Sequence, residues 1–158
     1  MTDAKVLYET DFHEWLLDQA TALRRAAAVG SNLDLDFENL AEEIESMGKS
    51  ELGAVESAYA RVIEHLLKLE QSPARYPRRG WKVSVTVHRQ DAEEELRKSP
   101  SLLGKIDWGR LYRRARKVAA VSLEGDGIAA RDLPESCPYT LEQIRDEDWW
   151  PANRHGLD

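Results

Sequence analysis

Apolar side chains recur every three to four residues along much of this chain, which is the spacing of one face of an α-helix. The first such stretch predicts a helix from about Asp11 to Val29, with Thr10 or Asp11 as its N-cap and Gly30 at its end. Five of its residues fall on one expected inward face: Phe12, Trp15, Leu16, Gln19 and Leu23.

A second apolar pattern keeps one phase across two glycines. It predicts a single helix from Asp36 to about Gln71, weakened at Gly48 and Gly53. The alternative is two helices joined at residues 48–50, with Ser50 as a new N-cap. The expected inward residues of this segment are Leu40, Ile44, Met47, Val55, Tyr59, Val62, Ile63 and Leu66.

All six prolines lie at Pro73 or later, and two of them mark residues 72–80 as a loop. Residues 81–87 then alternate as in a β-strand, but a stripe at helical spacing continues further along the same segment. We therefore expect a helix from Arg79 to Lys98, which Ser99 and Pro100 end. The stripe contains Trp81, Val85, His88, Ala92 and Leu96.

Two further helices are expected in the last third of the chain. The first covers Lys105 to about Glu124 and is stopped by the glycines of residues 125–127. A capping box formed by Thr140 and Gln143 predicts a short helix from Leu141 to Asp146. The expected inward residues of the longer helix are Ile106, Leu111, Ala115, Val118, Ala119 and Ser122.

These segments together predict the all-α class. We expect a single up-and-down helical bundle of four main helices plus a short C-terminal helix. The 158 residues suit one domain, 1–158, with a core over about residues 8–151.

Composition narrows the class of protein further. Hydrophobic residues make up 42% and charged residues 32% of the chain, which is typical of a globular protein. The one cysteine, Cys137, cannot form an internal disulfide, and residues 1–10 do not resemble a signal peptide. No apolar run is long enough to span a membrane. We therefore expect a cytoplasmic protein with no membrane partner.

Charge is segregated along the chain, whose formal net charge is −7. Residues 34–45 hold six acidic residues and no basic one, whereas residues 105–117 hold six basic residues and one acidic. The net charge makes nucleic acid an unlikely partner, and only Tyr112 lies near the basic stretch as a stacking aromatic. We expect four cations to share a helix face that contacts acidic protein, within the chain or across a subunit contact: Arg110, Arg113, Arg114 and Lys117.

Six short motifs occur in a characteristic order. They are Tyr8-Glu9-x-Asp11-Phe12-x-x-Trp15, Asn39-Leu40-Ala41-Glu42-Glu43-Ile44-Glu45, His65-Leu66-Leu67-Lys68, Trp81 with Arg89, Ser99-Pro100-Ser101-Leu102, and Cys137-Pro138-Tyr139-Thr140. In this order they resemble the domain-of-unknown-function family twenty-nine, helical proteins of cyanobacteria and other bacteria. The resemblance covers about residues 8–151 and implies a bacterial α-helical bundle, with no established activity.

An acidic and histidine cluster is the catalytic candidate. Glu42, Glu43, Glu45 and His65 could hold a divalent metal or perform acid–base chemistry. On one straight helix, however, 23 residues separate Glu42 from His65, or roughly 34 Å. The cluster therefore forms only if the chain reverses near Gly48 or a second subunit contributes its copy.

Metal-ligand spacing is missing from the chain. No histidine has a glutamate three residues before it, as a di-iron bundle requires, and the zinc motif His-Glu-x-x-His does not occur. His13, His65 and His88 lie one on each predicted helix and could form a metal site only if the fold brings them together. We therefore expect no metal and no other cofactor.

Trp81 and Arg89 are further ligand or partner contact candidates, since they lie two turns apart on one predicted helix. We expect Trp81 to close one end of the bundle. We expect Arg89 to pair internally with an acidic side chain of residues 42–45, and the alternative is an anionic ligand.

The sequence therefore favours a protein-binding or self-associating module, with a protein partner or a homo-oligomer as the assembly. The alternative is a metal-dependent, hydrolase-like enzyme that uses Glu42, Glu43, Glu45 and His65. The two hypotheses differ in whether these side chains converge on one cleft.

Overall fold

The computed structural model describes residues 3–157, and within that range the chain is helical with no β-strand. This confirms the all-α class. The helices in chain order are α1 (Ala4–Thr10), α2 (Phe12–Ala28), α3 (Phe37–Gln71), α4 (Arg78–Lys98), η1 (Pro100–Lys105), α5 (Trp108–Glu124), η2 (Ala130–Asp132) and α6 (Leu141–Arg145), where η marks a 3₁₀ helix.

The predicted ends of the first long helix are confirmed in α2. The Asp11 carboxylate caps it by accepting a hydrogen bond from the Glu14 amide at 3.0 Å. Gly30 follows the last turn with φ +72°, a left-handed conformation that favours glycine. The preceding helix α1 was not expected, because its seven residues carry no apolar repeat long enough to recognise.

Helix α3 runs without a break from Phe37 to Gln71, so the alternative of two helices is wrong. Gly48 is buried, and a Cβ added there would lie 3.3 Å from the His13 ring. Glycine at this position therefore permits a close approach of α2 rather than a helix end. Gly53 has open space around it and is an interior helix position without such a contact.

Two other helix starts differ from expectation by a few residues. Helix α4 begins at Arg78 within the expected loop, and the strand alternative for residues 81–87 is wrong. Helix α5 begins at Trp108 with Asp107 as its N-cap, because residues 100–105 form a separate 3₁₀ helix. The capping box of α6 is confirmed.

Residue contacts divide the chain into two compact units. Unit 1 comprises the chain up to Val55 together with Glu94–Ile106, and unit 2 comprises Glu56–Glu93 and the chain from Asp107 onward. The expectation of a single domain therefore stays a prediction. Unit 1 holds 14 acidic and 7 basic residues, and unit 2 holds 15 of each, so the whole net charge of −7 belongs to unit 1.

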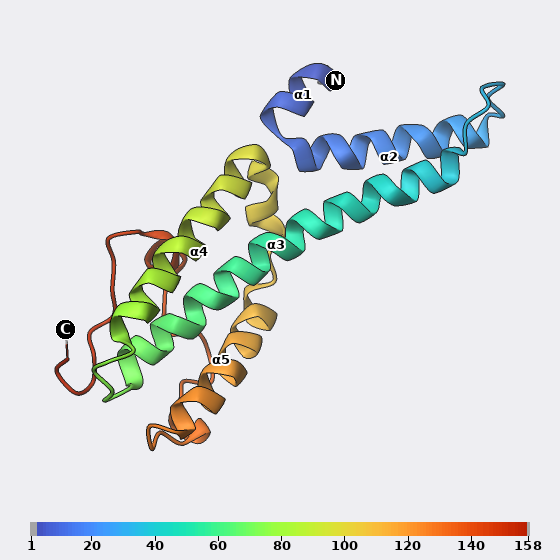
Figure 1. Cartoon of the computed structure of the whole chain (residues 1–158). Helices are drawn as coiled ribbons and strands as arrows, with labels where there is room; N and C mark the ends of the chain where they lie inside the picture. The colour runs from blue at the N-terminus through green and yellow to red at the C-terminus, as the bar shows by residue number, and fades with distance from the viewer. Residues whose placement is uncertain (1–2, 158) are drawn as a thin grey trace. The chain divides into compact units, whose positions relative to one another are not determined.

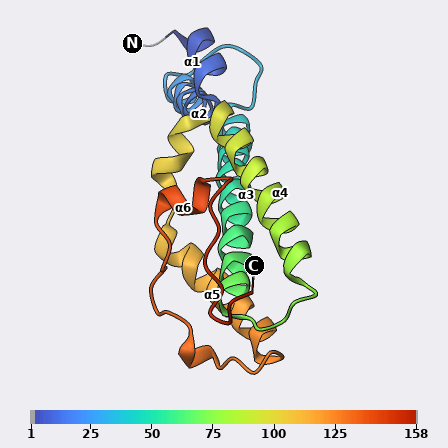
Figure 2. The ribbon, with the colours of Figure 1, turned by 90° about the vertical axis from the view of Figure 1, so that its left-hand side faces the viewer.

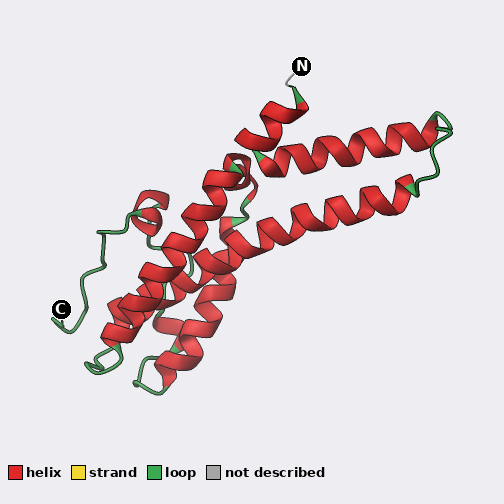
Figure 3. Ribbon diagram, turned by 45° about the horizontal axis from the view of Figure 1, so that its top comes forward, coloured by secondary structure: helices red, strands yellow, loops and turns green. Residues whose placement is uncertain are grey.

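In unit 1, α2 runs beside the first half of α3 in a helical hairpin (Figures 1 and 3). Small residues, Ala20, Ala41 and Gly48, are buried in it. Because the two helices pack closely at these small residues, the buried face of α3 is shifted by about one residue from the face that the apolar pattern predicted. Leu40 and Met47, which were expected to face inward, are instead 40% and 50% exposed.

Aromatic side chains of α1 and α2 pack together in unit 1. Phe12 and Trp15 were expected inside the core but are only half-buried, and Tyr8 of α1 packs edge-on against both. The ring centroids of Tyr8 and Trp15 are 4.9 Å apart. This cluster packs α1 against the hairpin.

In unit 2, the second half of α3, α4 and α5 enclose a core of large side chains. The buried face of α5 repeats every fourth residue through Ala115, Ala119 and Leu123, whereas Val118 and Ser122, expected inside, are exposed. Figure 2 shows the C-terminal segment, in red, running along these helices. It is fixed by the Asn153 side-chain amide, which donates to two α3-end carbonyls at 2.7 and 2.9 Å.

Candidate functional site

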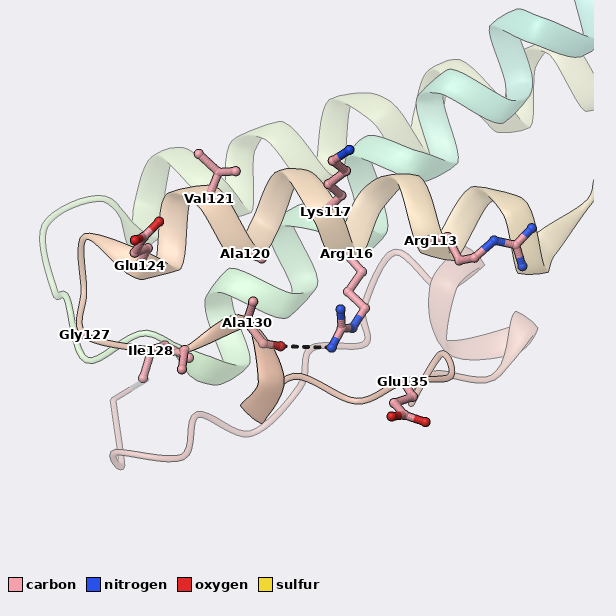
Figure 4. Close-up of a pocket in the computed structure, with 11 residues that line it drawn as sticks. Arg113, Arg116, Lys117, Ala120, Val121, Glu124, Gly127, Ile128, Ala130 and Glu135 are labelled. Atoms are coloured by element: carbon pink, nitrogen blue, oxygen red, sulfur yellow. Dashed lines mark hydrogen bonds between the residues drawn. The ribbon is translucent and has the colours of Figure 1, made fainter.

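A cavity of about 990 Å³ lies in unit 2 beside α5. Its wall consists of one face of α5 and the segment after that helix (Figure 4). We call it the basic pocket, because three cationic side chains line it. The lining residues are Arg113, Arg116, Lys117, Ala120, Val121, Glu124, Gly127, Ile128, Ala129, Ala130 and Glu135.

Arg116 is held in place by the backbone of the segment that it faces. Its Nε donates to the Pro134 carbonyl at 2.9 Å, and its Nη2 donates to the carbonyls of Ala130 and Leu133 at 2.9 and 3.1 Å. Figure 4 shows this side chain reaching from α5 toward Ala130. Three hydrogen bonds to one planar guanidinium fix the shape of the pocket, since they join both of its walls.

The other two cations of the pocket are exposed. Neither Arg113 nor Lys117 forms an ion pair within residues 3–157. Their neighbours on the same helix are engaged: Arg110 pairs with Glu56 at 3.0 Å, and Arg114 lies 3.5 Å from the Ser57 hydroxyl. The hydrogen bond to Glu56 raises the pKa of Arg110. Two charges of the expected basic face are therefore available to a partner.

The remaining wall is mostly apolar. Val121 is 71% exposed although it lines a cavity, and Ala120, Ile128 and Ala129 continue the same surface. Two carboxylates also line the pocket: Glu124, at the last turn of α5, and Glu135. Eleven helical residues separate Arg113 from Glu124, or roughly 16 Å, so these two charges lie toward opposite ends. Glu135 lies on the Arg113 side of the pocket (Figure 4). The pocket thus combines a cationic end with an apolar middle.

Within unit 1, two carboxylates of the acidic run of residues 34–45 pair with α2. Arg24 of α2 forms ion pairs with Glu45 and with Glu38, the latter at 3.7 Å. Glu42 and Glu43 are exposed. All of these contacts lie within unit 1.

The expected catalytic cluster is not assembled within the chain. Because α3 is continuous, Glu42, Glu43 and Glu45 are five or more turns away from His65 on the same helix. The His65 Nδ1 lies 2.8 Å from the Arg61 carbonyl oxygen, and burial lowers the pKa of this histidine. Among residues 3–157 no group of three histidine, cysteine, aspartate or glutamate side chains is placed to hold a metal ion.

The other two candidate histidines have surroundings of their own. His13 is buried in unit 1 against Gly48, and burial lowers its pKa. His88 is half-buried in unit 2, with its Nδ1 3.8 Å from the Asp91 carboxylate. Neither belongs to a metal-ligand group within the described part of the chain.

Arg89 is internal, as expected, but the expected carboxylate partner is wrong. It is fully buried and donates to three backbone carbonyls, those of Gln143, Ile144 and Trp149, at 2.9 to 3.0 Å. Its guanidinium carbon also lies 5.3 Å from the centre of the Trp150 ring. Burial lowers the pKa of Arg89. The residue fastens α6 and the chain after it to α4, and it is not free to bind an anionic ligand.

Trp81 is half-buried, and the Lys68 ammonium lies 5.8 Å from the centre of its ring. Cys137 is a free, partly buried thiol whose pKa is raised by burial. Neither residue lines the basic pocket.

The Ser99-Pro100-Ser101 motif has a structural task in unit 1. The Ser99 hydroxyl accepts from the His13 amide at 3.0 Å and donates to Glu51 at 2.8 Å. Ser101 donates to the Asp11 cap through both its amide and its hydroxyl. The Ser99 bond satisfies the free His13 amide in the first turn of α2, and the Ser101 bonds hold the Asp11 cap, so the motif fixes that helix end.

Sequence reasoning missed half of the pocket. Residues 127–135 carried no recognisable motif, and Arg116 was counted among the basic residues without being singled out. One signal in the sequence could have indicated the site. Val121 follows Lys117 by one helical turn, so an apolar side chain lies next to the cations on the same face of the helix.

Fold and surface together define a helical protein without an assembled metal centre among its described residues. None of the described helices is long and apolar enough to cross a membrane. The chain belongs to the family described as domain of unknown function DUF29, whose model matches residues 7–150. This confirms the family resemblance of the motifs.

One solved structure shows the same fold. The chain is similar to an alpha-helical protein of unknown function from Rhodospirillum rubrum ATCC 11170, with 30% sequence identity and a TM-score of 0.79. The similarity covers 90% of each chain. A comparison with curated proteins finds no similar sequence.

Proposed function

We propose that this protein is a protein-binding module whose basic pocket takes an acidic segment that carries an apolar side chain. The observation that supports it is the pairing, in one cavity of about 990 Å³, of two unpaired cations with an exposed apolar wall. Cavities of a few hundred to about 1,000 Å³ are typical of binding sites.

The two parts of the pocket have different tasks in this proposal. Covering Val121 and Ile128 removes apolar surface from water, which provides most of the affinity. Arg113 and Lys117 attract and orient a carboxylate, which adds selectivity and speeds association. Arg116 needs no ordering on binding, because three carbonyls already hold it.

A protein partner fits this surface better than a nucleic acid. None of the pocket's lining residues is aromatic, so the bases of a single strand would have no stacking platform. Glu124 and Glu135 would repel a phosphate backbone that followed the pocket along its length.

The test is binding of short labelled peptides, measured by fluorescence anisotropy. A hexapeptide of alternating Leu and Asp is the probe, and peptides of alternating Leu and Lys or Ser and Asp are its controls. We expect only the Leu-Asp peptide to bind, and more weakly at about 200 mM than at about 50 mM salt.

Matched variants locate the binding. The double variant Arg113→Glu/Lys117→Glu should weaken binding about tenfold, because each exposed ion pair contributes up to about 1 kcal/mol. Val121→Ser should weaken it about threefold. The controls are Arg75→Glu/Arg79→Glu and Val118→Ser, which change exposed residues of unit 2 outside the pocket. Equal affinity of the pocket and control variants would contradict the proposal.

A further inference from the structure

The connection between α2 and α3 exposes the kind of segment that the basic pocket would take. Within this loop, residues 29–36, Leu33 and Leu35 are 66% and 53% exposed. Asp34 lies between them, exposed and without an ion pair within residues 3–157. The loop therefore presents one free carboxylate flanked by two apolar side chains.

This loop is already ordered by its own hydrogen bonds. The Leu33 amide donates to the Ser31 hydroxyl at 3.3 Å, and the Leu35 amide donates to the Leu33 carbonyl at 2.9 Å. Asp36 is occupied as a cap, since its carboxylate accepts from the Asn39 amide at 3.2 Å. A preordered segment loses little conformational entropy on binding, which favours docking of the loop as a unit.

We infer that the basic pocket of one copy takes the α2–α3 loop of a second copy of this chain. The inference rests on the proposed function and names the partner. Asp34 lies against Arg113 and Lys117, and a leucine of the loop covers Val121 and Ile128. Glu124 sets the direction, because it repels Asp34 from the end of the pocket opposite Arg113.

The charges of the two units favour this contact. The loop belongs to unit 1, which carries the whole net charge of −7, and the pocket belongs to unit 2, which has no net charge. A unit 2 with a locally cationic face can approach an acidic unit 1 without net repulsion.

The contact is heterologous, because it joins two different surfaces. Each copy has one loop and one pocket, so a bound pair still presents one of each. Further copies add head to tail, and the assembly closes as a ring or grows as a chain.

Sedimentation velocity of the full chain over about 5 to 500 μM tests the inference. The average mass should rise with concentration and fall as salt increases from about 50 to 200 mM. The loop variant Leu33→Ser/Asp34→Lys and the pocket variant Arg113→Glu/Lys117→Glu should each remain monomeric. The matched control Leu17→Ser/Asp18→Lys changes an exposed Leu-Asp pair of α2 and should assemble as the unchanged chain does.

A mixture of the two defective variants is the sharper measurement. The loop variant retains a pocket and the pocket variant retains a loop, so together they can form one contact. We expect the mixture to form a dimer whose mass does not increase further at high concentration. Assembly by either variant alone, or no dimer in the mixture, overturns the inference.

The peptide assay separates this failure from failure of the proposed function. If the Leu-Asp peptide binds the pocket while the chain stays monomeric at every concentration, the second copy is not the partner and the binding function stands. If the peptide does not bind, both are wrong. Circular dichroism spectra and melting curves check that each variant is folded, which is expected because all substituted residues are exposed.

Discussion

The two units of the chain bury their helix faces in different ways. Unit 1 is acidic and brings two helices together through small residues, which leaves Leu40 and Met47 at the surface. Unit 2 has no net charge, and three long helices enclose large side chains such as Tyr59 and Leu66. Unit 1 adds only the end of α4 and the short helix η1 to its two-helix hairpin, whereas in unit 2 a third long helix encloses the core.

Charged side chains differ between the units in the same way. Aside from His13, none of the charged residues that the structure describes in unit 1 is buried, and Arg24 pairs with Glu45 where both are partly exposed. In unit 2 several are inside, such as Arg89 on its three carbonyls and Glu64 on Lys68. The comparison shows that the net charge of the chain describes unit 1 and not unit 2.

The largest effect is expected from removing Arg89, a fully buried cation of unit 2. Arg89→Leu should lower the free energy of unfolding by about 4 kcal/mol, because it leaves three buried carbonyls without donors. Urea denaturation measures it, with the exposed Arg79→Leu as the control on the same helix, where a change within about 0.5 kcal/mol is expected. A small loss in Arg89→Leu would show that water reaches these carbonyls.

The second prediction compares a core leucine from each unit. Leu66→Ala in unit 2 should cost about 4 kcal/mol and Leu16→Ala in unit 1 about 3 kcal/mol, although both side chains are fully buried. The reason is that the hairpin of unit 1, which only the end of α4 and the short helix η1 accompany, can collapse around the cavity more easily than the core of unit 2, which three long helices enclose. Equal losses in denaturation experiments would remove this distinction between the units.

Two glycines of α3 should respond in opposite ways. Gly53→Ala should stabilise the chain by about 0.5–1 kcal/mol, since alanine favours a helix and nothing obstructs a Cβ there. At Gly48 the new Cβ would lie 3.3 Å from the His13 ring, so Gly48→Ala should gain nothing or destabilise. Melting temperatures of both variants check this. An equal gain at both sites would mean that α2 moves easily to make room for a Cβ at residue 48.

The smallest effect is a pH dependence carried by one buried histidine in each unit. Burial lowers the pKa of His13 and of His65, so the unfolded chain binds protons that the folded chain does not. The contribution of these two neutral histidines to the free energy of unfolding is therefore fully present above the ordinary histidine pKa of about 6.5, and it should decrease as the pH falls through that value. Denaturation midpoints near pH 7.5 and pH 5.5 measure the loss, and His13→Gln and His65→Gln should each reduce it. The loss in one variant but not the other would assign it to one unit.

Most helix boundaries could be predicted because their causes are local. Asp11 and Thr140 cap the helices that follow them, and Gly30 ends α2 through a conformation that other residues rarely adopt. The continuity of α3 through Gly48 also followed from the unbroken apolar phase. Helix α1 escaped prediction because aromatic contacts, rather than an apolar repeat, hold it.

The face of each helix that is buried depends instead on how closely the neighbouring helices pack. Leu40 and Met47 are as hydrophobic as any core residue, yet Ala41 and Gly48 occupy the interior because only small side chains allow α2 so close. A hydrophobic pattern records which residues can be buried, and it does not record how near the next helix comes.

The basic face of α5 was visible in the sequence, whereas its pocket was not. Cations at helical spacing identify a face of one helix, because that geometry involves only neighbouring residues. The opposite wall comes from residues 127–135, which Arg116 holds by their backbone carbonyls. The same is true of Arg89, whose partners are the carbonyls of residues 143–149. Every residue has a carbonyl, so no pattern of side chains predicts which carbonyls accept these hydrogen bonds. The bonds form only when segments that are distant in the sequence pack together.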